Sequence, residues 1–441
     1  MEIQKSNQCL ISLGLYGILF LIISVSQIFA QTDIETSKKL LEKLNQQLIE
    51  IDADQRNELN ALQKRSSVKG EFETTKKFDE RSKKEETEWN SLYNQIDSQQ
   101  GIDREKIYKE INRILSKEFS GVFQVDLGVY DADKQVFPLL INKTFKEFIV
   151  VPLGEARELK ENFSKAEKTG ILGVVLDSKN QAIEYLISGQ IKYNGKVYNI
   201  TTNTFSNSRA MRMLFGNYDD TSKYATWTLY LQKFYVDGSD EDVYVPVTVY
   251  AKILAIKSYT DQNQEKRVLI TQTAPTLEDN SCHACSVTIS VAVFSKQNDY
   301  WKIEQAQKNT GRYGSFGEVS PPIIVKIGIN RYALKYDSFY MNMGEAAGGE
   351  QYITLDGGLF NEIFNVSTHQ DNTASMASIK DQMSSNSKVI FKPFSDSVYF
   401  DAIVSTSGKR GKKIGNRYML SPFVQTDLYR CSDGKYLLVK K

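Results

Sequence analysis

Two cysteines separated by two residues, Cys282 and Cys285, have the clearest potential for chemistry in this chain. Such a pair exchanges thiols and disulfides when it opens a helix, because the helix N-terminus stabilises the reactive thiolate. Here the alternating stretch from Val287 to Phe294 follows the pair, and that pattern is typical of a strand. The pair therefore lacks the helix that redox catalysis uses, and a structural disulfide is the preferred interpretation.

Other uses of these cysteines stay open. Cys431 offers a second partner, so the disulfide candidates are Cys282, Cys285 and Cys431. A zinc site built on Cys282, Cys285 and His283 needs a fourth ligand, and no spacing in the sequence requires one. Thiol–disulfide exchange at Cys282 and Cys285 is the remaining alternative. Ser286 stands where haem attachment needs a histidine, and we expect neither a cofactor nor a metal.

Histidine is rare, since His283 and His369 are the two in a chain of 441 residues. A three-histidine zinc centre within one chain is thereby excluded, and any nucleophile with a histidine base must use one of the two. Gly311, Gly314 and Gly317 do not have the spacing of a dinucleotide-binding loop. A hydrolase that uses two carboxylates leaves no such motif, so it stays an enzymatic alternative beside thiol–disulfide exchange.

The first thirty residues have the pattern of a secretory signal peptide. Lys5 gives a basic start, an apolar run extends from Leu10 to Ile23, and Ala30 is a small residue at a suitable cleavage point. We therefore expect a secreted, periplasmic or cell-envelope protein, in which oxidising conditions favour disulfides. The alternative is an uncleaved membrane anchor, because about 20 residues are barely enough to span a bilayer.

Composition and residue pattern divide the rest of the chain into three expected regions. These are a charged helical region over 31–118, an α+β strand-rich domain over 119–275 and a β-rich C-terminal domain over 276–441. Short aromatic and β-branched runs between turn residues indicate antiparallel strands. The predicted fold class is α+β and mostly antiparallel β, with the helical region followed by two domains that resemble sandwiches or open barrels.

Within the helical region, Leu41, Leu44, Leu48 and Ile51 form one stripe at helical spacing. Gly101 is expected to end a second helix, and Asp103 to begin a third. The stripe breaks before it completes the heptads of a sustained coiled coil. A helical hairpin, or a helix packed on the next domain, is the plain interpretation, and an oligomerisation stalk is the alternative.

A basic segment lies between two expected strands, Val398 to Val404 and Asn416 to Val424. It is predicted to be a loop, and its candidate ligand-binding residues are Lys409, Arg410, Lys412, Lys413 and Arg417. Such a loop could meet an anionic polysaccharide, lipid headgroups or an acidic partner, and a solvated loop is the plain alternative. The net charge of +1 gives no long-range attraction to nucleic acid, so no nucleic-acid partner is expected.

These observations favour an exported, non-catalytic protein of the envelope or extracellular space, with a binding or structural role. Its partner is predicted to be a glycan, an envelope surface or another protein, with oligomerisation through the N-terminal helices as a further option. The alternative is a secreted enzyme, either a carboxylate-based hydrolase or a thiol–disulfide oxidoreductase at Cys282 and Cys285.

Overall fold

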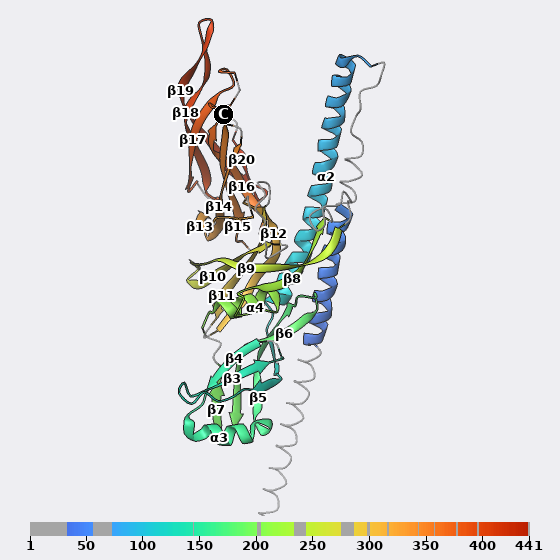
Figure 1. The fold of residues 1–441 in the computed structure, drawn as a ribbon, viewed down its shortest axis with the longest axis vertical. Helices are drawn as coiled ribbons and strands as arrows, with labels where there is room; N and C mark the ends of the chain where they lie inside the picture. Colours follow the sequence, from blue (N-terminus) through green and yellow to red (C-terminus); the bar gives the residue numbers. More distant parts are fainter. Residues whose placement is uncertain are drawn as a thin grey trace, which may run out of the picture. The chain divides into compact units, whose positions relative to one another are not determined.

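The structure is a computed structural model that describes most of the chain after residue 32. The described residues are 33–55, 73–143, 145–200, 204–232, 244–274, 286–297, 300–314, 317–342, 344–356, 358–375, 378–394 and 397–439. The predicted signal peptide and the residues Cys282, His283 and Cys285 therefore lie outside them. The fold is α+β, with N-terminal helices followed by antiparallel sheets, and this confirms the predicted fold class (Figure 1).

Two compact units make up the chain. The first unit is Met1–Thr248 with Gln297–Lys302, and the second unit is Val249–Lys296 with Ile303–Lys441. Each is described by itself below. Among the described residues, no helix is both long and apolar enough to cross a bilayer.

Two antiparallel helices open the first unit, over residues 33–55 and in α2 (Thr75–Leu115). The Thr74 side chain caps α2 by accepting a hydrogen bond from the backbone of Lys77. Leu41 is fully buried, as the predicted stripe requires. The guanidinium of Arg104 joins the two helices by contacting the Asp52 carboxylate at 2.6 Å. The plain interpretation, a helical hairpin, is confirmed.

The expected helix end at Gly101 and the expected helix start at Asp103 are both wrong, because α2 continues through these residues. A glycine inside a helix costs about 1 kcal/mol relative to alanine. The ion pair between Arg104 and Asp52, one turn further along, offsets that cost by holding α2 against the first helix. The helical pair also packs on the sheet of its own unit, where Glu42 accepts a hydrogen bond from the backbone of Ala182 at 2.8 Å.

Two small sheets and two further α-helices complete the first unit. One sheet has the order β1-β5-β6-β7, and the other has the order β2-β3-β4. The strands of these two sheets are β1 (Phe119–Val122), β2 (Val125–Leu127), β3 (Val136–Ile141), β4 (Phe145–Val150), β5 (Glu167–Leu176), β6 (Ala182–Tyr193) and β7 (Lys196–Asn199). A further strand of this unit, β8 (Ala225–Gln232), belongs to neither sheet. The helices are α3 (Leu153–Glu161), the short η1 (Phe163–Lys165) and α4 (Asn207–Phe215). Helix α4 ends at Gly216, whose φ of 74° suits the left-handed C-cap position.

The first sheet of the second unit pairs its strands in the order β12-β11-β10-β9. These are β9 (Tyr244–Asp261), β10 (Gln264–Ala274), β11 (Val287–Gln297) and β12 (Tyr300–Tyr313). Most residues of β10 and β11 are buried, and consecutive residues are buried together, because both faces of these strands are covered. The pairing of β10 with β11 joins strands from both sides of the predicted boundary at residues 275–276.

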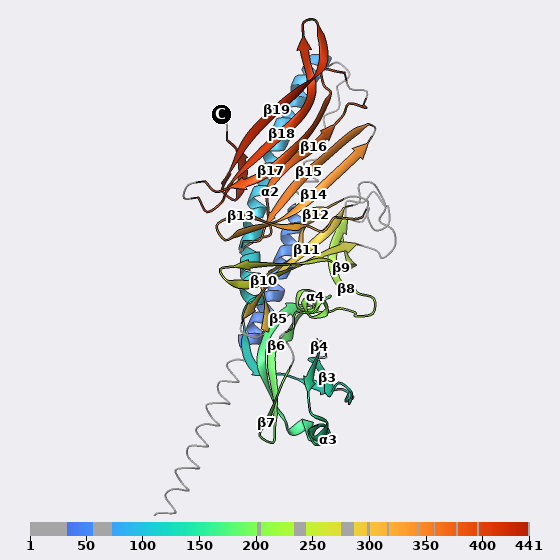
Figure 2. The same cartoon turned by 90° about the vertical axis from the view of Figure 1, so that its left-hand side faces the viewer.

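The second sheet of this unit is an eight-stranded meander. Its strands are β13 (Ile323–Gly328), β14 (Arg331–Asn342), β15 (Glu345–Thr354), β16 (Glu362–Asp371), β17 (Met383–Lys392), β18 (Asp401–Ile414), β19 (Arg417–Ser432) and β20 (Lys435–Leu438). Figure 2 shows these strands side by side, from β13 to β19. Leu334 and Tyr336 of β14 join a core with Ile270 and Ile289 of the other sheet.

The eight-stranded sheet curls, so that its first strand meets the segment that enters β18. The backbone N–H of Phe400 donates to the carbonyl of Ile327, and that of Ile329 donates to the carbonyl of Val398, both at 2.8 Å. Gly328 sits at this contact, where a Cβ atom would lie 2.3 Å from the carbonyl oxygen of Val398. A side chain at position 328 would therefore push the two segments apart.

A cluster of aromatic side chains fills the curl. Their ring centroids lie 5.0 to 6.4 Å apart, and the residues are Tyr352, Phe364, Phe391, Tyr429 and Tyr436. The Tyr436 hydroxyl donates to the carbonyls of Phe400 at 2.8 Å and Ile327 at 3.2 Å. This residue of β20 therefore ties the last strand to the contact that closes the curl.

Replacing Tyr436 by phenylalanine removes this hydroxyl and keeps the ring. We expect the free energy of unfolding to fall by about 1 kcal/mol, the typical net contribution of a buried hydrogen bond. Urea denaturation measures the change. Tyr418→Phe is the control, since Tyr418 is 45% exposed and its loss of a hydroxyl should leave stability unchanged. Equal stabilities of Tyr436→Phe and the wild type would show that the hydroxyl does not hold the curl.

Candidate functional site

The five predicted basic residues lie on a β-hairpin. Lys409, Arg410, Lys412 and Lys413 belong to β18, and Arg417 is the first residue of β19. The prediction of a loop is therefore wrong. The turn is shorter, at Gly415 and Asn416, and Gly415 has a φ of 60°. The strand was missed because glycine and charged residues replace the alternating apolar side chains after Val404.

The end of this hairpin extends beyond the rest of the sheet. The last β17–β18 pair joins Met383 to Arg410, whereas β18 and β19 stay paired as far as Ile414 and Arg417. Figures 1 and 2 show the two strands continuing past their neighbours to the turn. We call residues 407–424 the cationic hairpin.

Charge in the cationic hairpin has one sign. Residues 402–426 include five lysines or arginines and no aspartate or glutamate. All five side chains are exposed, and within the described part of the chain none of them forms an ion pair with a carboxylate. The guanidinium of Arg410 lies 4.9 Å from the ring centre of Phe423, a cation–π contact that orients it on the strand.

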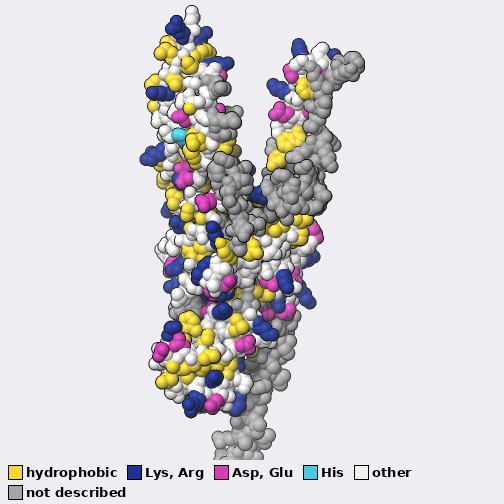
Figure 3. Space-filling view, in the orientation of Figure 1, with side chains coloured by type: hydrophobic (Ala, Val, Ile, Leu, Met, Phe, Trp, Pro, Cys, Tyr) yellow, Lys and Arg dark blue, Asp and Glu magenta, His cyan; other side chains and the backbone are white. Residues whose placement is uncertain are grey.

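Apolar side chains are interleaved with these cations. Five of them are between 37% and 81% exposed, namely Ile414, Tyr418, Met419, Leu420 and Val424. Figure 3 shows dark-blue and yellow atoms next to each other where Figure 1 places the β18–β19 turn. Paired residues share a face of a sheet, so Lys413 lies beside Tyr418 on one face, and Lys412 lies beside Met419 on the other. Both faces of the hairpin thus combine a positive charge with apolar surface.

A second group of ionisable residues lies where the eight-stranded sheet curls. The Tyr399 hydroxyl donates to the Asp356 carboxylate at 2.9 Å, and the Arg331 guanidinium lies 3.5 Å from the same oxygen. Burial raises the pKa of Asp356, although both contacts oppose the shift. A second buried carboxylate, that of Asp401, accepts two hydrogen bonds of 3.2 Å from Arg430. Each acid therefore contacts its own arginine, which reduces the cost of keeping a carboxylate charge in the curl.

Cys431 lies beside this group and packs against the aromatic cluster. Among the described residues it is the free cysteine, and burial raises the pKa of its thiol. A thiol that stays protonated is a poor nucleophile and a poor metal ligand. Cys282 and Cys285 lie outside the described residues, so the disulfide stays a prediction.

His369, the histidine proposed as a possible base, lies on β16. Its ring Nδ1 is 2.8 Å from the side-chain oxygen of Asn386, and its ring lies 6.0 Å from that of Phe339. His283 lies outside the described residues. In the part of the chain that the structure describes, no group of histidine, cysteine and acidic side chains is arranged to hold a metal ion.

Two arginines of α4 form a buried charge network in the first unit that sequence reasoning missed. The Arg209 guanidinium contacts the Glu147 carboxylate and donates to the carbonyls of Leu186 at 2.6 Å and Ile187 at 3.0 Å. Burial raises the pKa of Glu147 even beside this cation. Arg212, one turn further, contacts Asp220 at 2.6 Å. The one signal in the sequence is a pair of arginines three residues apart in an apolar helix.

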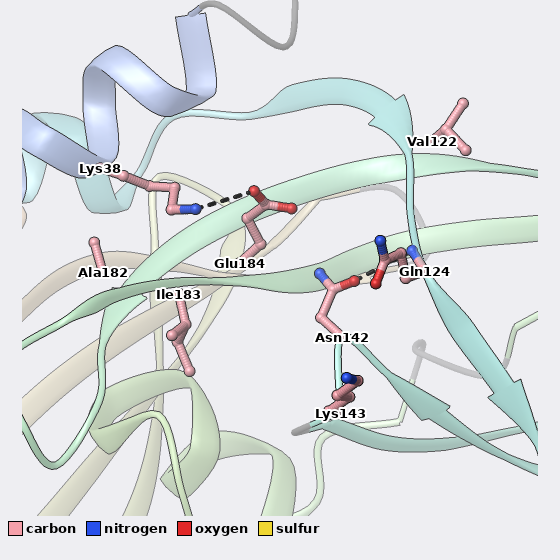
Figure 4. A pocket seen from close by; sticks show the side chains of 8 residues that line it. All are labelled: Lys38, Val122, Gln124, Asn142, Lys143, Ala182, Ile183 and Glu184. Carbon is pink, nitrogen blue, oxygen red and sulfur yellow. Dashed lines mark hydrogen bonds and ion pairs between the residues drawn. The ribbon is translucent and has the colours of Figure 1, made fainter.

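A polar pocket of about 440 Å³ opens on the first unit. It is lined by Lys38, Val122, Gln124, Asn142, Lys143, Ala182, Ile183 and Glu184 (Figure 4). The Lys38 ammonium lies 3.5 Å from Glu184 and 3.0 Å from Glu35, and the Asn142 side chain accepts a hydrogen bond from the backbone of Gln124. The contact between Lys38 and Glu184 joins the first helix to β6 at this pocket.

Comparisons with known proteins add no assignment. No protein-family model matches the chain, and no curated protein matches it in sequence. Among solved structures, the crystal structure of a mutant levansucrase from B. megaterium is matched at a TM-score of 0.20 and 9% sequence identity. That match covers 74% of this chain and 88% of the levansucrase chain. At this TM-score the likeness carries no argument about fold or activity.

The raised pKa of Asp356 predicts a pH-dependent contribution to stability. A carboxyl group whose pKa is higher in the folded protein stabilises the fold at low pH, and this contribution disappears as the pH rises through the folded pKa. Compared with Asp356→Asn, the wild type should therefore lose stability between about pH 3 and about pH 7, by ~1.4 kcal/mol per unit of pKa shift. Urea denaturation of both proteins at the two pH values measures this.

The Tyr399→Phe variant sharpens the test. In the wild type, the Tyr399 hydroxyl lowers the pKa of Asp356 by donating to the carboxylate. Removing this hydroxyl should therefore raise the pKa of Asp356 further and increase the pH dependence of stability. A stability difference between the wild type and Asp356→Asn that is the same at both pH values would contradict the raised pKa.

Proposed function

We propose that the protein is exported and acts without catalysis, as a binding protein of the cell envelope or extracellular space that holds an anionic ligand on its cationic hairpin. One observation carries this proposal. Five exposed cations share a projecting hairpin with no carboxylate between residues 402 and 426. Cations in a structural role are normally paired with acids, as Arg430 and Arg331 are in the same unit.

The local concentration of charge favours an extended anionic ligand. The chain as a whole has a net charge of +1, so long-range attraction is weak and the ligand must be recognised at the hairpin itself. Each lysine or arginine close to an anionic surface contributes about 1 kcal/mol. Five such groups on one hairpin therefore support binding to a repeating negative surface and give a single small anion little advantage.

Export is the second part of the proposal. It rests on the basic start, apolar core and small residue of the first thirty residues. An oxidising destination suits a disulfide between Cys282 and Cys285 ahead of β11. A non-catalytic role is supported by the two carboxyl groups with a raised pKa that lie in separate units, Glu147 and Asp356. Each contacts an arginine, as a carboxylate in a structural role does.

Neutralising the cationic hairpin tests the binding surface. The variant carries glutamine at Lys409, Arg410, Lys412, Lys413 and Arg417. On immobilised heparin, a polyanion, we expect it to elute at lower salt, with affinity at least ~10-fold below that of the wild type, because each cation contributes separately.

A matched control changes the same number of charges elsewhere. It carries glutamine at five exposed lysines of α2, namely Lys76, Lys77, Lys83, Lys84 and Lys106. This variant should elute with the wild type. Equal losses in the two variants would show that total charge governs binding, and the assignment of the hairpin would be wrong.

Peptide mapping without reduction tests the disulfide. In protein isolated from its own compartment, we expect Cys282 and Cys285 to be linked and Cys431 to be free. Native Cys431 should react slowly with iodoacetamide near neutral pH, because burial raises the pKa of its thiol. Three free thiols, or a link that includes Cys431, would contradict this pairing.

A further inference from the structure

The end of the cationic hairpin has no sheet neighbour. The backbone N–H of Gly411 still donates to the carbonyl of Gln382 at 2.9 Å. Beyond Gly411, β18 pairs with β19 alone, from Lys412 opposite Met419 to Ile414 opposite Arg417. A two-stranded ribbon is marginally stable in water, so natural hairpins of this kind usually pack their apolar side on something. Here Ile414 and Met419 are 52% and 55% exposed, and both lie within this end.

The dimensions of this end match the interfacial layer of a membrane. Strands rise about 3.4 Å per residue, so the stretch from Gly411 to Ile414 extends roughly 10 Å past the sheet. Interfacial segments bury their apolar side chains about 5 to 10 Å into the boundary between headgroups and acyl chains. The apolar side chains of the hairpin end can therefore reach that boundary while the rest of the sheet stays in water.

Charge and apolar surface are arranged as an interface requires. Lys412 and Lys413 precede Ile414 directly, and Arg417 lies opposite it across the turn. Long lysine and arginine side chains extend back towards the headgroups while their aliphatic stems cover apolar surface. Tyr418 has the amphipathic ring that is enriched at membrane interfaces.

We infer that the ligand of the cationic hairpin is an anionic lipid bilayer. Ile414, Met419 and Leu420 enter the boundary between headgroups and acyl chains, and the five cations contact lipid phosphates. This inference rests on the proposed function and names its ligand. An anionic polysaccharide would engage the cations and leave the apolar side chains in water, whereas a bilayer interface engages both.

The experiment separates apolar insertion from charge. The mature wild-type chain is sedimented with vesicles of phosphatidylcholine alone, and with vesicles that contain about 30% phosphatidylglycerol. An insertion variant carries serine at Ile414, Met419 and Leu420 and keeps every charge. A control variant carries serine at three exposed apolar residues of the same unit, Ile323, Ile329 and Leu438.

We expect the wild type and the control variant to bind the anionic vesicles, with little binding to phosphatidylcholine. The insertion variant should bind the anionic vesicles at least ~10-fold more weakly, while its elution from heparin is unchanged. Thermal unfolding followed by circular dichroism should give all three proteins the same midpoint, because the replaced side chains are exposed.

A fluorescent reporter gives a second measurement. Tyr418→Trp places an indole on the hairpin, and its emission should shift to shorter wavelength with anionic vesicles and be quenched by brominated acyl chains. The same vesicles with the insertion variant of this reporter should give no shift.

Three outcomes would overturn the inference. If the insertion variant binds anionic vesicles as tightly as the wild type, the contact is electrostatic only. If the wild type binds heparin and no vesicles, the ligand is another polyanion, and the proposed function stands without the bilayer. If the wild type binds neither heparin nor vesicles, the proposed function fails together with this inference.

Discussion

The closure of the eight-stranded sheet on itself is the contact on which the second unit depends. Two backbone hydrogen bonds, at Ile327 of β13 and at Ile329 just after it, reach the segment entering β18, and Gly328 permits the approach. Once these segments meet, the aromatic cluster is enclosed, and the Tyr436 hydroxyl fixes β20 against the closure. The two acids at this place, Asp356 and Asp401, are each held by an arginine, so their charges remain inside the curl with partners.

This closure also explains how one hairpin has two different ends. Near the closure, Ala402 and Val404 of β18 are almost fully buried in the aromatic cluster. Further along, β17 ends, and beyond Gly411, which donates to the carbonyl of Gln382, the same two strands continue paired with each other alone. The buried base holds the register of the pair, and that register presents Lys413 with Tyr418 and Lys412 with Met419. A rigid base with an exposed amphipathic end is the arrangement that a contact surface needs.

The first unit uses charge differently. Arg209 contacts two backbone carbonyls and Glu147 from the buried side of α4, so its positive charge holds the helix to neighbouring strands. Removing one partner of such a pair leaves an uncompensated charge in a region that excludes water. The cations of α4 thus contribute to a single packed arrangement, whereas those of the cationic hairpin face solvent.

The sequence by itself determined the fold class, the helical stripe through Leu41 and the absence of a histidine-rich catalytic centre, because periodicity and composition are local properties. It also placed the five cations on one segment. The sequence did not show that these cations lie on strands, because the segment lacks the apolar alternation that normally indicates a strand. The strands form there because β18 and β19 pair with each other. Gly101 misled for a similar reason, since the ion pair between Arg104 and Asp52 links residues 52 positions apart. Only the tertiary structure decided three features: the curl at Gly328, the burial of Arg209 and the projection of the hairpin. The reason is that each of them arises from contacts between segments that are distant in the sequence.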